Sequence, residues 1–244
     1  MEERLQNLLA HRGVSSRRGA AAMIEAGHVE VDGQVVREPG ARFDPATAKI
    51  AVDGRLLSAA EEKTRTIMMY NPAGVLSTMS DPFGGKTVAD LLKWGSRTVT
   101  ERLVPVGRLD KDSEGLLLMS NDGDLTLRLT HPRYEHEKTY IVRAAGRWSD
   151  DKLRVLRGPV EMPDGYVTRP VPVEVVRIGR DNVHVLCFRL REGRKRQIRY
   201  MCSAAHLVVV SLKRVAIGAL RLPDDLAPGE WRDITPAERA SLLK

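Results

Sequence analysis

Apolar positions near the start of the chain predict two short helices. The leucines of LQNLLAH (5–11) share one helical face, and Gly13 is placed to end this helix. Ser15 or Ser16 is suited to cap a second helix, which turns its apolar residues inward and ends at Gly27. A pair of packed helices is therefore expected to open the fold.

Two strand–turn–strand segments follow these helices. They are VEVDGQVV and IAVDGRLL, each with Asp-Gly at the position of the turn. The polar stretch SAAEEKT (58–64) then interrupts the apolar pattern. We therefore expect a small domain over residues 1–60, a linker over 61–64 and a larger domain over 65–244.

The larger domain is predicted to hold more strands than helices. Apolar runs predict strands at 65–70, 103–107, 115–120, 138–144, 171–178 and 182–190, and a broken strand at 207–222. Helices are expected at 87–94, 122–130, 149–157 and 194–205, the first from a capping-box pattern of Thr87 and Asp90. Because the strands do not alternate regularly with the helices, the pattern favours an α+β fold with a mainly antiparallel sheet flanked by helices.

Composition narrows the class of protein. The hydrophobic fraction of 42% over 244 residues is enough for a core, which excludes a disordered chain. No apolar stretch approaches the ~18–20 residues that span a bilayer, and the N-terminus has no apolar signal core. We therefore expect a cytoplasmic protein without a membrane partner. Cys187 and Cys202 stand in apolar surroundings and are expected to be buried free thiols.

Positive charge is concentrated in one segment. The chain has a net charge of +7 and a pI of about 9.6. Residues 1–60 carry eight basic and eight acidic residues, whereas residues 189–221 carry nine Lys and Arg against the single acid Glu192. Apolar positions interleave these basic residues, so a folded element presents them. This arrangement favours a nucleic-acid surface over an ordinary solvated charge run.

The segment VPVGRLDKDSEGLLLMS has the most unusual pattern. A strand leads into GRLD and resumes at Leu116, which places Asp110 in a loop at the rim of a sheet. DKDSEG resembles the start of a calcium loop, but leucines follow its glycine and Asn121 stands where an acidic ligand is required. Calcium is therefore disfavoured, and from this segment alone Asp110 is either a catalytic carboxylate or a plain turn residue.

A basic helix and a tyrosine complete the candidate chemistry. A helix over 194–205 has an apolar stripe with Arg199 on its flank, from which it can reach a carboxylate. Arg196 points away from that stripe and is expected to stay in solvent or on phosphate. Tyr140 of EKTY alternates with apolar residues on a strand, where it either belongs to the core or stacks on a base.

These segments together resemble a known family. LQNLLAHRGVSSRRGAAAMIEAGHVEVDGQ is similar to the helix pair and hairpin of S4 domains. VGRLDKDSEGLLLMSNDGDL, EKTY, EGRKRQIRYM and SLKRVAIGAL resemble, in that order, motifs of bacterial ribosomal-RNA pseudouridine synthases that have an N-terminal S4-like domain. The family often has a glycine near Ala205 and His206, which this chain lacks. The segment NPAGVLSTMSDPFGGKTVADLL is more similar to the large-subunit-rRNA branch.

The resemblance implies a reaction and roles for its residues. The fold would be an S4-like RNA-binding domain followed by a pseudouridine synthase domain that isomerises a uridine of ribosomal RNA, without a cofactor or metal. Asp110 would be the catalytic aspartate, Arg199 its cationic partner, and Tyr140 the ring that stacks on uracil. Leu109 and Leu212 would line the pocket.

RNA contacts are expected in two regions. Arg108, beside the catalytic loop, is expected to contact RNA or help to flip the nucleotide. The other basic candidates lie at the corner of the first two helices and in the C-terminal basic segment: Arg12, Ser16, Arg17, Arg18, Arg194, Lys195, Arg196, Lys213 and Arg214. The expected partner is ribosomal RNA, and we expect a monomer.

Three alternatives stay open at this point. One is a synthase for small-subunit rRNA, and another is a non-catalytic RNA-binding or ribosome-associated protein built on the S4 unit. The third is a metal-dependent nuclease that uses Asp110, Asp112 and Glu114, which the spacing of these carboxylates disfavours.

Overall fold

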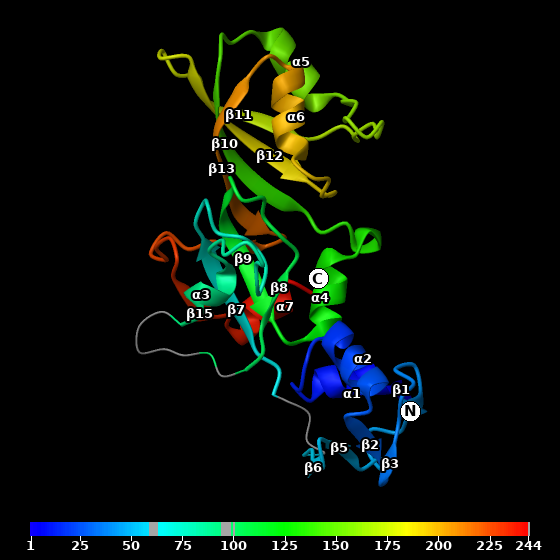
Figure 1. Cartoon of the computed structure of the whole chain (residues 1–244). Coiled ribbons are helices and arrows are strands. Elements are labelled where there is room, and N and C mark those ends of the chain that lie inside the picture. The colour runs from blue at the N-terminus through cyan, green and yellow to red at the C-terminus, as the bar shows by residue number, and fades with distance from the viewer. Residues whose placement is uncertain (59–62, 94–98, 100, 244) are drawn as a thin grey trace. The chain divides into compact units, whose positions relative to one another are not determined.

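The chain divides into two compact units in a computed structural model that describes residues 1–58, 63–93, 99 and 101–243 (Figure 1). The smaller unit holds the described residues of 1–65 with Glu101 and Arg102, and the larger unit holds the described residues of 66–99 and 103–243. The expected linker at 61–64 lies partly outside the described residues, so the domain boundaries given above stay predictions.

The smaller unit consists of a helix pair and short strands. Its elements are β1 (Glu3–Arg4), α1 (Leu5–His11), α2 (Arg17–Ala26), β2 (Val29–Val31), β3 (Gln34–Val35), β4 (Arg42–Phe43), β5 (Ile50–Val52) and β6 (Arg55–Leu56). The helix pair and the two hairpin regions were predicted, and the structure confirms them. Leu5, Leu9, Ile24 and Ile50 are fully buried between the helices and the sheet β3–β2–β5–β6.

Ser16 supplies the cap of α2. Its Oγ accepts a hydrogen bond from the backbone N–H of Gly19 at 2.9 Å. We expect Ser16→Ala to cost about 1 kcal/mol of the stability of this helix, because one N–H at the helix start loses its acceptor. Hydrogen exchange across α2 measures this loss. Ser15→Ala is the control, since the cap bond of α2 is made by Ser16; equal protection in the two variants would contradict the assignment.

The larger unit is built on a long sheet. Its elements are β7 (Thr66–Asn71), α3 (Val88–Leu91), β8 (Val104–Val106), β9 (Glu114–Ser120), α4 (Gly123–Thr130), a 3₁₀ turn (Pro132–Tyr134), β10 (Lys138–Ala145), α5 (Asp150–Arg157), β11 (Val173–Arg177), β12 (Val183–Leu190), α6 (Gln197–Ala204), β13 (Val208–Ile217), β14 (Leu220–Arg221), β15 (Trp231–Asp233) and α7 (Pro236–Ser241). Residue 94, the end of the helix predicted at 87–94, lies outside the described residues.

The sheet of the larger unit is mainly antiparallel, as predicted. Over the described residues it has nine strands in the order β11–β12–β10–β13–β9–β7–β15, with β8 paired to β9 and β14 paired to β13. Only β9 and β13 pair in parallel among these strands. In Figure 1, α5 and α6 lie together on one face of the half formed by β10 to β13. The fold is therefore α+β.

The half of the sheet around β7 and β9 is buried on both faces. Met68, Leu116 and Leu118 pack on one face, whereas Ile67 and Leu117 pack on the other. Neighbouring side chains of a strand point to opposite faces, so a strand covered on both sides is apolar throughout. This explains why TIMMYN and GLLLMS are continuous rather than alternating apolar runs.

The parallel contact between β9 and β13 depends on Gly115. Gly115 pairs with Arg214 and has a φ of +110°. A Cβ at this position would lie 2.2 Å from the carbonyl oxygen of Arg214, which is too close for any side chain. The glycine therefore lets β13 approach the end of the loop that contains Asp110.

The C-terminal elements were not predicted. The strand β15 has only three residues, which gives no readable alternation. The helix α7 does have a signal, because Thr235 and Glu238 form a capping box around Pro236 at the helix start. Across the part of the chain that the structure describes, helices are too short or too polar to cross a bilayer.

Candidate active site

The loop between β8 and β9 holds Asp110 in place through its backbone. The hydroxyl of Ser77 donates to the carbonyl oxygen of Leu109 (3.2 Å) and accepts from its N–H (3.1 Å). The N–H of Ser113 donates to the carbonyl oxygen of Asp110 at 2.9 Å and closes a turn. The N–H of Gly74 donates to the carbonyl oxygen of Lys111 at 2.6 Å. The backbone around Asp110 is thus fixed without any use of its carboxylate.

Arg214 supports the same loop from inside the protein. Its Nε donates to the carbonyl oxygen of Leu116 at 2.7 Å, and one terminal nitrogen donates to the carbonyl oxygen of Arg108 at 3.3 Å. The residue is only 2% exposed. Arg214 was expected to bind RNA. The structure places it inside the protein, because β13 passes through the middle of the sheet, and gives it backbone partners in the active-site loop. A contact of Arg214 with RNA stays a prediction.

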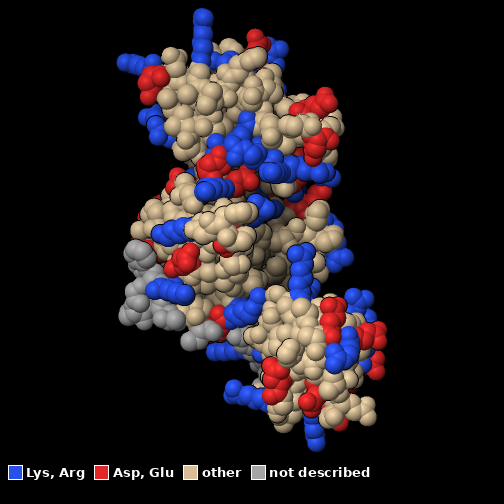
Figure 2. All heavy atoms as spheres, viewed as in Figure 1, with Lys and Arg blue, Asp and Glu red and all other residues tan. Residues whose placement is uncertain are grey.

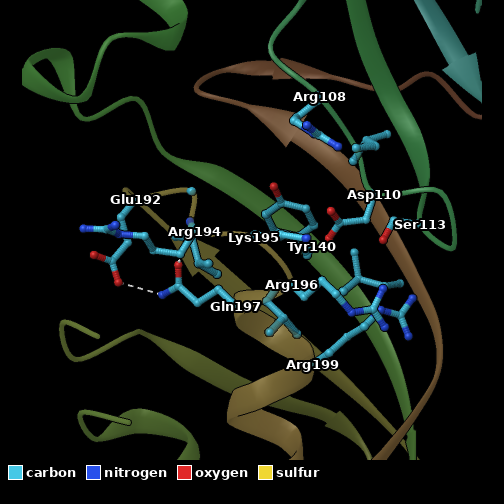
Figure 3. A pocket seen from close by; sticks show the side chains of 15 residues that line it. Arg108, Asp110, Ser113, Tyr140, Glu192, Arg194, Lys195, Arg196, Gln197 and Arg199 are labelled. Carbon is cyan, nitrogen blue, oxygen red and sulfur yellow. Dashed lines mark hydrogen bonds between the residues drawn. The ribbon is translucent and has the colours of Figure 1, made fainter. Parts of the chain in front are cut away.

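A cavity of about 270 Å³ brings together the residues expected at the reaction centre. Asp110, Tyr140, Leu109 and Leu212 line it, and so does Arg108. Figure 3 shows the carboxylate of Asp110 beside the ring of Tyr140. Leu109 and Leu212 are buried and provide apolar walls. A half-buried carboxylate, an aromatic ring and apolar walls are suited to hold a flat base next to a reactive group.

The partner of Arg199 differs from the expectation. Its Nε lies 3.2 Å from a carboxylate oxygen of Asp112, and a terminal nitrogen donates to the Asp112 carbonyl oxygen at 2.6 Å. The carboxylate of Asp110 makes no ion pair or side-chain hydrogen bond within the described part of the chain. The predicted pair of Arg199 and Asp110 is therefore wrong, because α6 faces the far end of the loop, two residues after Asp110.

Arg196 also contacts the loop instead of solvent. The helix α6 begins at Gln197 and not at Arg194, because Arg196 has a left-handed backbone with a φ of +58°. This turn directs its guanidinium to Asp112, where one nitrogen lies 3.0 and 2.9 Å from the two carboxylate oxygens. Arg196 was expected to stay in solvent or on phosphate, and the structure instead pairs it with Asp112. Asp112 thus bridges Arg196 and Arg199.

Glu192 organises the segment before α6, and the sequence analysis missed its role. It accepts hydrogen bonds from the hydroxyl of Tyr166 (2.7 Å), the side-chain amide of Gln197 (2.6 Å) and the N–H of Arg169 (3.2 Å). Figure 3 shows the bond to Gln197. Arg194 lies over the ring of Tyr166, 3.7 Å from its centroid. A signal was present, since Glu192 is the only acid within a strongly basic segment.

A second, larger cavity adjoins the first. It has a volume of about 760 Å³ and shares Arg108, Tyr140 and Arg194 with the smaller one. Five arginines and Lys138 line it. In Figure 2, Lys and Arg side chains form a band across this part of the larger unit, with a few acidic side chains among them. The two cavities together form a basic cleft that contains Asp110.

The other basic candidates have different surroundings. Lys195 and Arg194 are exposed at the rim of the smaller cavity. Lys213 is half-buried, and its Nζ lies 4.5 Å from the centroid of the Tyr70 ring. Burial and a hydrogen bond to Glu114 raise the pKa of Tyr70 to about 12. Lys213 pairs with Glu114, the first residue of β9, and so lies where the active-site loop ends.

In the smaller unit, two of the four expected RNA contacts are free at the surface. Arg17 and Arg18 are exposed. Arg12 is half-buried and donates to the carbonyl oxygen of Pro45 at 3.0 Å, while the hydroxyl of Ser16 caps α2. Ser16 and Arg12 thus have structural partners of their own.

The three carboxylates of the nuclease alternative have separate surroundings. Asp112 pairs with two arginines, and Glu114 accepts a hydrogen bond from Tyr70 at 3.0 Å. A divalent cation requires oxygen ligands that converge on one point and are free of cationic partners. The arrangement does not favour a metal bound by these residues. Cys187 and Cys202 are buried free thiols, as predicted.

Comparisons with known proteins identify both parts of the chain. Residues 65–204 match the family model described as RNA pseudouridylate synthase, and residues 3–47 match the S4 domain. The chain is 36% identical to a ribosomal large subunit pseudouridine synthase B of Bacillus subtilis, over 97% of this chain and 93% of the relative. A protein of the same name from Shigella flexneri is 38% identical, over 98% of this chain and 81% of the relative.

A solved structure gives the same result for the fold. A crystal structure of a pseudouridylate synthase superimposes with a TM-score of 0.69 at 26% identity, and the match covers 98% of this chain and 99% of the other. The family model spans more than half of this chain, including Asp110, Tyr140 and Arg199. The chain therefore belongs to the family of RNA pseudouridylate synthases, whose reaction is the isomerisation of uridine in RNA.

Proposed function

We propose that this protein converts one uridine of large-subunit ribosomal RNA into pseudouridine. The observation that carries the proposal is the carboxylate of Asp110 beside Tyr140, which has no ion pair among the described residues and lies in a small cavity that adjoins a larger basic one. Two relatives that match nearly the whole chain have names that specify the large ribosomal subunit, which supports that choice of RNA.

The cleft suits a nucleotide that has left its helix. A stacked or paired uridine does not expose its reacting atoms, so the nucleotide must swing out to reach Asp110. Its uracil would then lie against Tyr140, between the apolar walls of Leu109 and Leu212. Arginines around the larger cavity would contact phosphates of the strand on either side.

Asp110 would act at the reacting atoms. The bond between C1′ of the ribose and N1 of uracil breaks, the base turns, and a new bond forms between C1′ and C5. The hydrogen at C5 is then lost, and a proton returns to N1, so the product is an isomer of the substrate. The carboxylate serves either as the nucleophile or as the base that removes a ribose proton. Tyr140 lies beside this carboxylate and would assist in the final proton transfer.

Mapping pseudouridine in ribosomal RNA tests the proposal. Cells that lack this gene are expected to lose one pseudouridine from large-subunit rRNA and none from small-subunit rRNA. The wild-type gene should restore it, whereas a gene with Asp110→Asn should not. Loss of a pseudouridine from small-subunit rRNA instead would overturn the choice of RNA. An unchanged map in both subunits would contradict the proposed function itself.

A further inference from the structure

Lys138 places a positive charge inside the larger cavity, and no acidic residue among those that the structure describes forms an ion pair with it. It begins β10, two residues before Tyr140, so both side chains lie on the same face of the strand. Both line the larger cavity. The Nζ of Lys138 donates one hydrogen bond of 3.3 Å to the carbonyl oxygen of His136. An ammonium group has three N–H donors, so two of them are available to a ligand.

The surroundings of Lys138 add further positive charge. Burial, and then the nearby guanidinium of Arg214, lower the pKa of Lys138. Arg214 has used two of its nitrogens on the carbonyl oxygens of Leu116 and Arg108, and its other terminal nitrogen is buried without a partner among the described residues. Two cations that are removed from water are costly to keep without an anion nearby. The site is therefore complementary to a negatively charged ligand.

The acidic residues of this cavity have other partners. Glu135 binds Arg169 at 2.6 Å, and this pair lowers the pKa of Glu135. Glu192 accepts from Tyr166 and Gln197. Neither carboxylate forms an ion pair with Lys138 within the described residues. An anion that balances Lys138 and Arg214 would therefore come from a bound molecule.

We propose that Lys138, reinforced by the charge of Arg214 behind it, binds one backbone phosphate of the RNA strand that enters the active site. The proposal rests on the proposed function for the identity of the ligand. The larger cavity shares Arg108, Tyr140 and Arg194 with the smaller one, so a strand whose base occupies the smaller cavity continues past Lys138. Every nucleotide of RNA carries a phosphate, and lysine binds phosphate as a point charge.

The site also reaches the catalytic loop. Arg214 holds the carbonyl oxygen of Arg108, two residues before Asp110, and lines the larger cavity together with Lys138. A phosphate bound by Lys138 would reduce the repulsion between the two cations and favour the arrangement in which Arg214 keeps its bond to the loop. Lys138 would thus link the position of the strand to the loop that carries Asp110.

Salt-dependent RNA binding tests this site. The full chain, Lys138→Met, Lys138→Gln and Lys138→Arg are titrated with a transcript of large-subunit rRNA at several KCl concentrations. Each phosphate contact changes the slope of log K against log salt by about one unit. We expect Lys138→Met and Lys138→Gln to reduce this slope by about one unit, and Lys138→Arg to keep it. Lys86→Met is the matched control, since Lys86 is exposed and lines neither cavity.

The unfolding temperature and the formation of pseudouridine distinguish a phosphate site from a purely structural lysine and from failure of the proposed function. Lys138→Met should unfold at the wild-type temperature or above it, because it removes a half-buried cation near Arg214. A purely structural lysine would instead lower that temperature and leave the slope intact. An unchanged slope in both neutral variants overturns the phosphate site. Failure of the proposed function appears separately, as a wild-type protein that binds the transcript but forms no pseudouridine.

Discussion

Asp110→Asn is expected to abolish pseudouridine formation while RNA affinity stays close to that of the wild-type protein. The carboxylate lines the smaller cavity beside Tyr140 and has no ion pair or side-chain hydrogen bond within the described part of the chain. A carboxylate that is not used for structure is available for chemistry. Removing a group that bonds to or deprotonates the substrate typically lowers the rate by at least about 10⁴-fold.

The same substitution should leave the fold intact. Ser77 and Gly74 hold the loop through its backbone, and the turn from Asp110 to Ser113 is also a backbone hydrogen bond. Asparagine has nearly the same shape as aspartate, so these bonds are kept. RNA affinity depends mainly on Lys and Arg contacts with phosphates, and the loss of one negative charge near the cleft does not weaken them.

Release of tritium from RNA labelled at C5 of uridine measures the reaction, because this hydrogen is lost when the new bond forms. RNA binding and circular dichroism are measured on the same preparation. Asp124→Asn, an exposed carboxylate on α4, is the control and should behave like wild type. Turnover of Asp110→Asn within tenfold of wild type would contradict the catalytic assignment.

The sequence predicted the parts of the fold that have a strong local signal. The helix pair of the smaller unit, the long strands β9, β10 and β12, and the capping box of α3 were all expected, because apolar periodicity and caps determine such elements locally. The parallel contact of β9 and β13 was not expected. It joins residues 98 or more positions apart, and its only local signal is Gly115.

In the candidate site, too, the sequence predicted what local motifs determine and missed what tertiary contacts determine. Asp110, Tyr140, Leu109 and Leu212 line one cavity, as a set of motif residues suggests. The arginines of the basic segment did not follow the helical-face argument, because that argument assumed a regular helix from Arg194. The left-handed backbone of Arg196 shortens the helix and turns this residue toward the loop. A non-glycine residue in that conformation is held by tertiary contacts, which periodicity does not reveal.

The arrangement around Asp112 changes the interpretation of the two arginines. Both bind this carboxylate, but only Arg199 also binds the carbonyl oxygen of Asp112. The side chain of Arg199 is 15% exposed, against 38% for Arg196 and 44% for Asp112. Because Asp112 is partly in water, the ion pairs themselves contribute little. The bond of Arg199 to the backbone, in contrast, fixes the end of the loop that begins its turn at Asp110.

Arg199→Ala is therefore expected to lower kcat strongly, whereas Arg196→Ala should mainly raise KM. A displacement of about 1 Å in a reacting group costs on the order of 100-fold in rate, and we expect a loss of this size when α6 no longer holds the loop. Arg196→Ala removes a more exposed side chain at the rim of the cavity, so more RNA should restore its turnover.

Both variants are measured across RNA concentrations, with Asp112→Asn as a third variant. Asp112→Asn keeps the backbone carbonyl that Arg199 binds, so its kcat should stay within a few-fold of wild type. If Arg199→Ala and Arg196→Ala behave alike, the backbone bond of Arg199 does not position the loop.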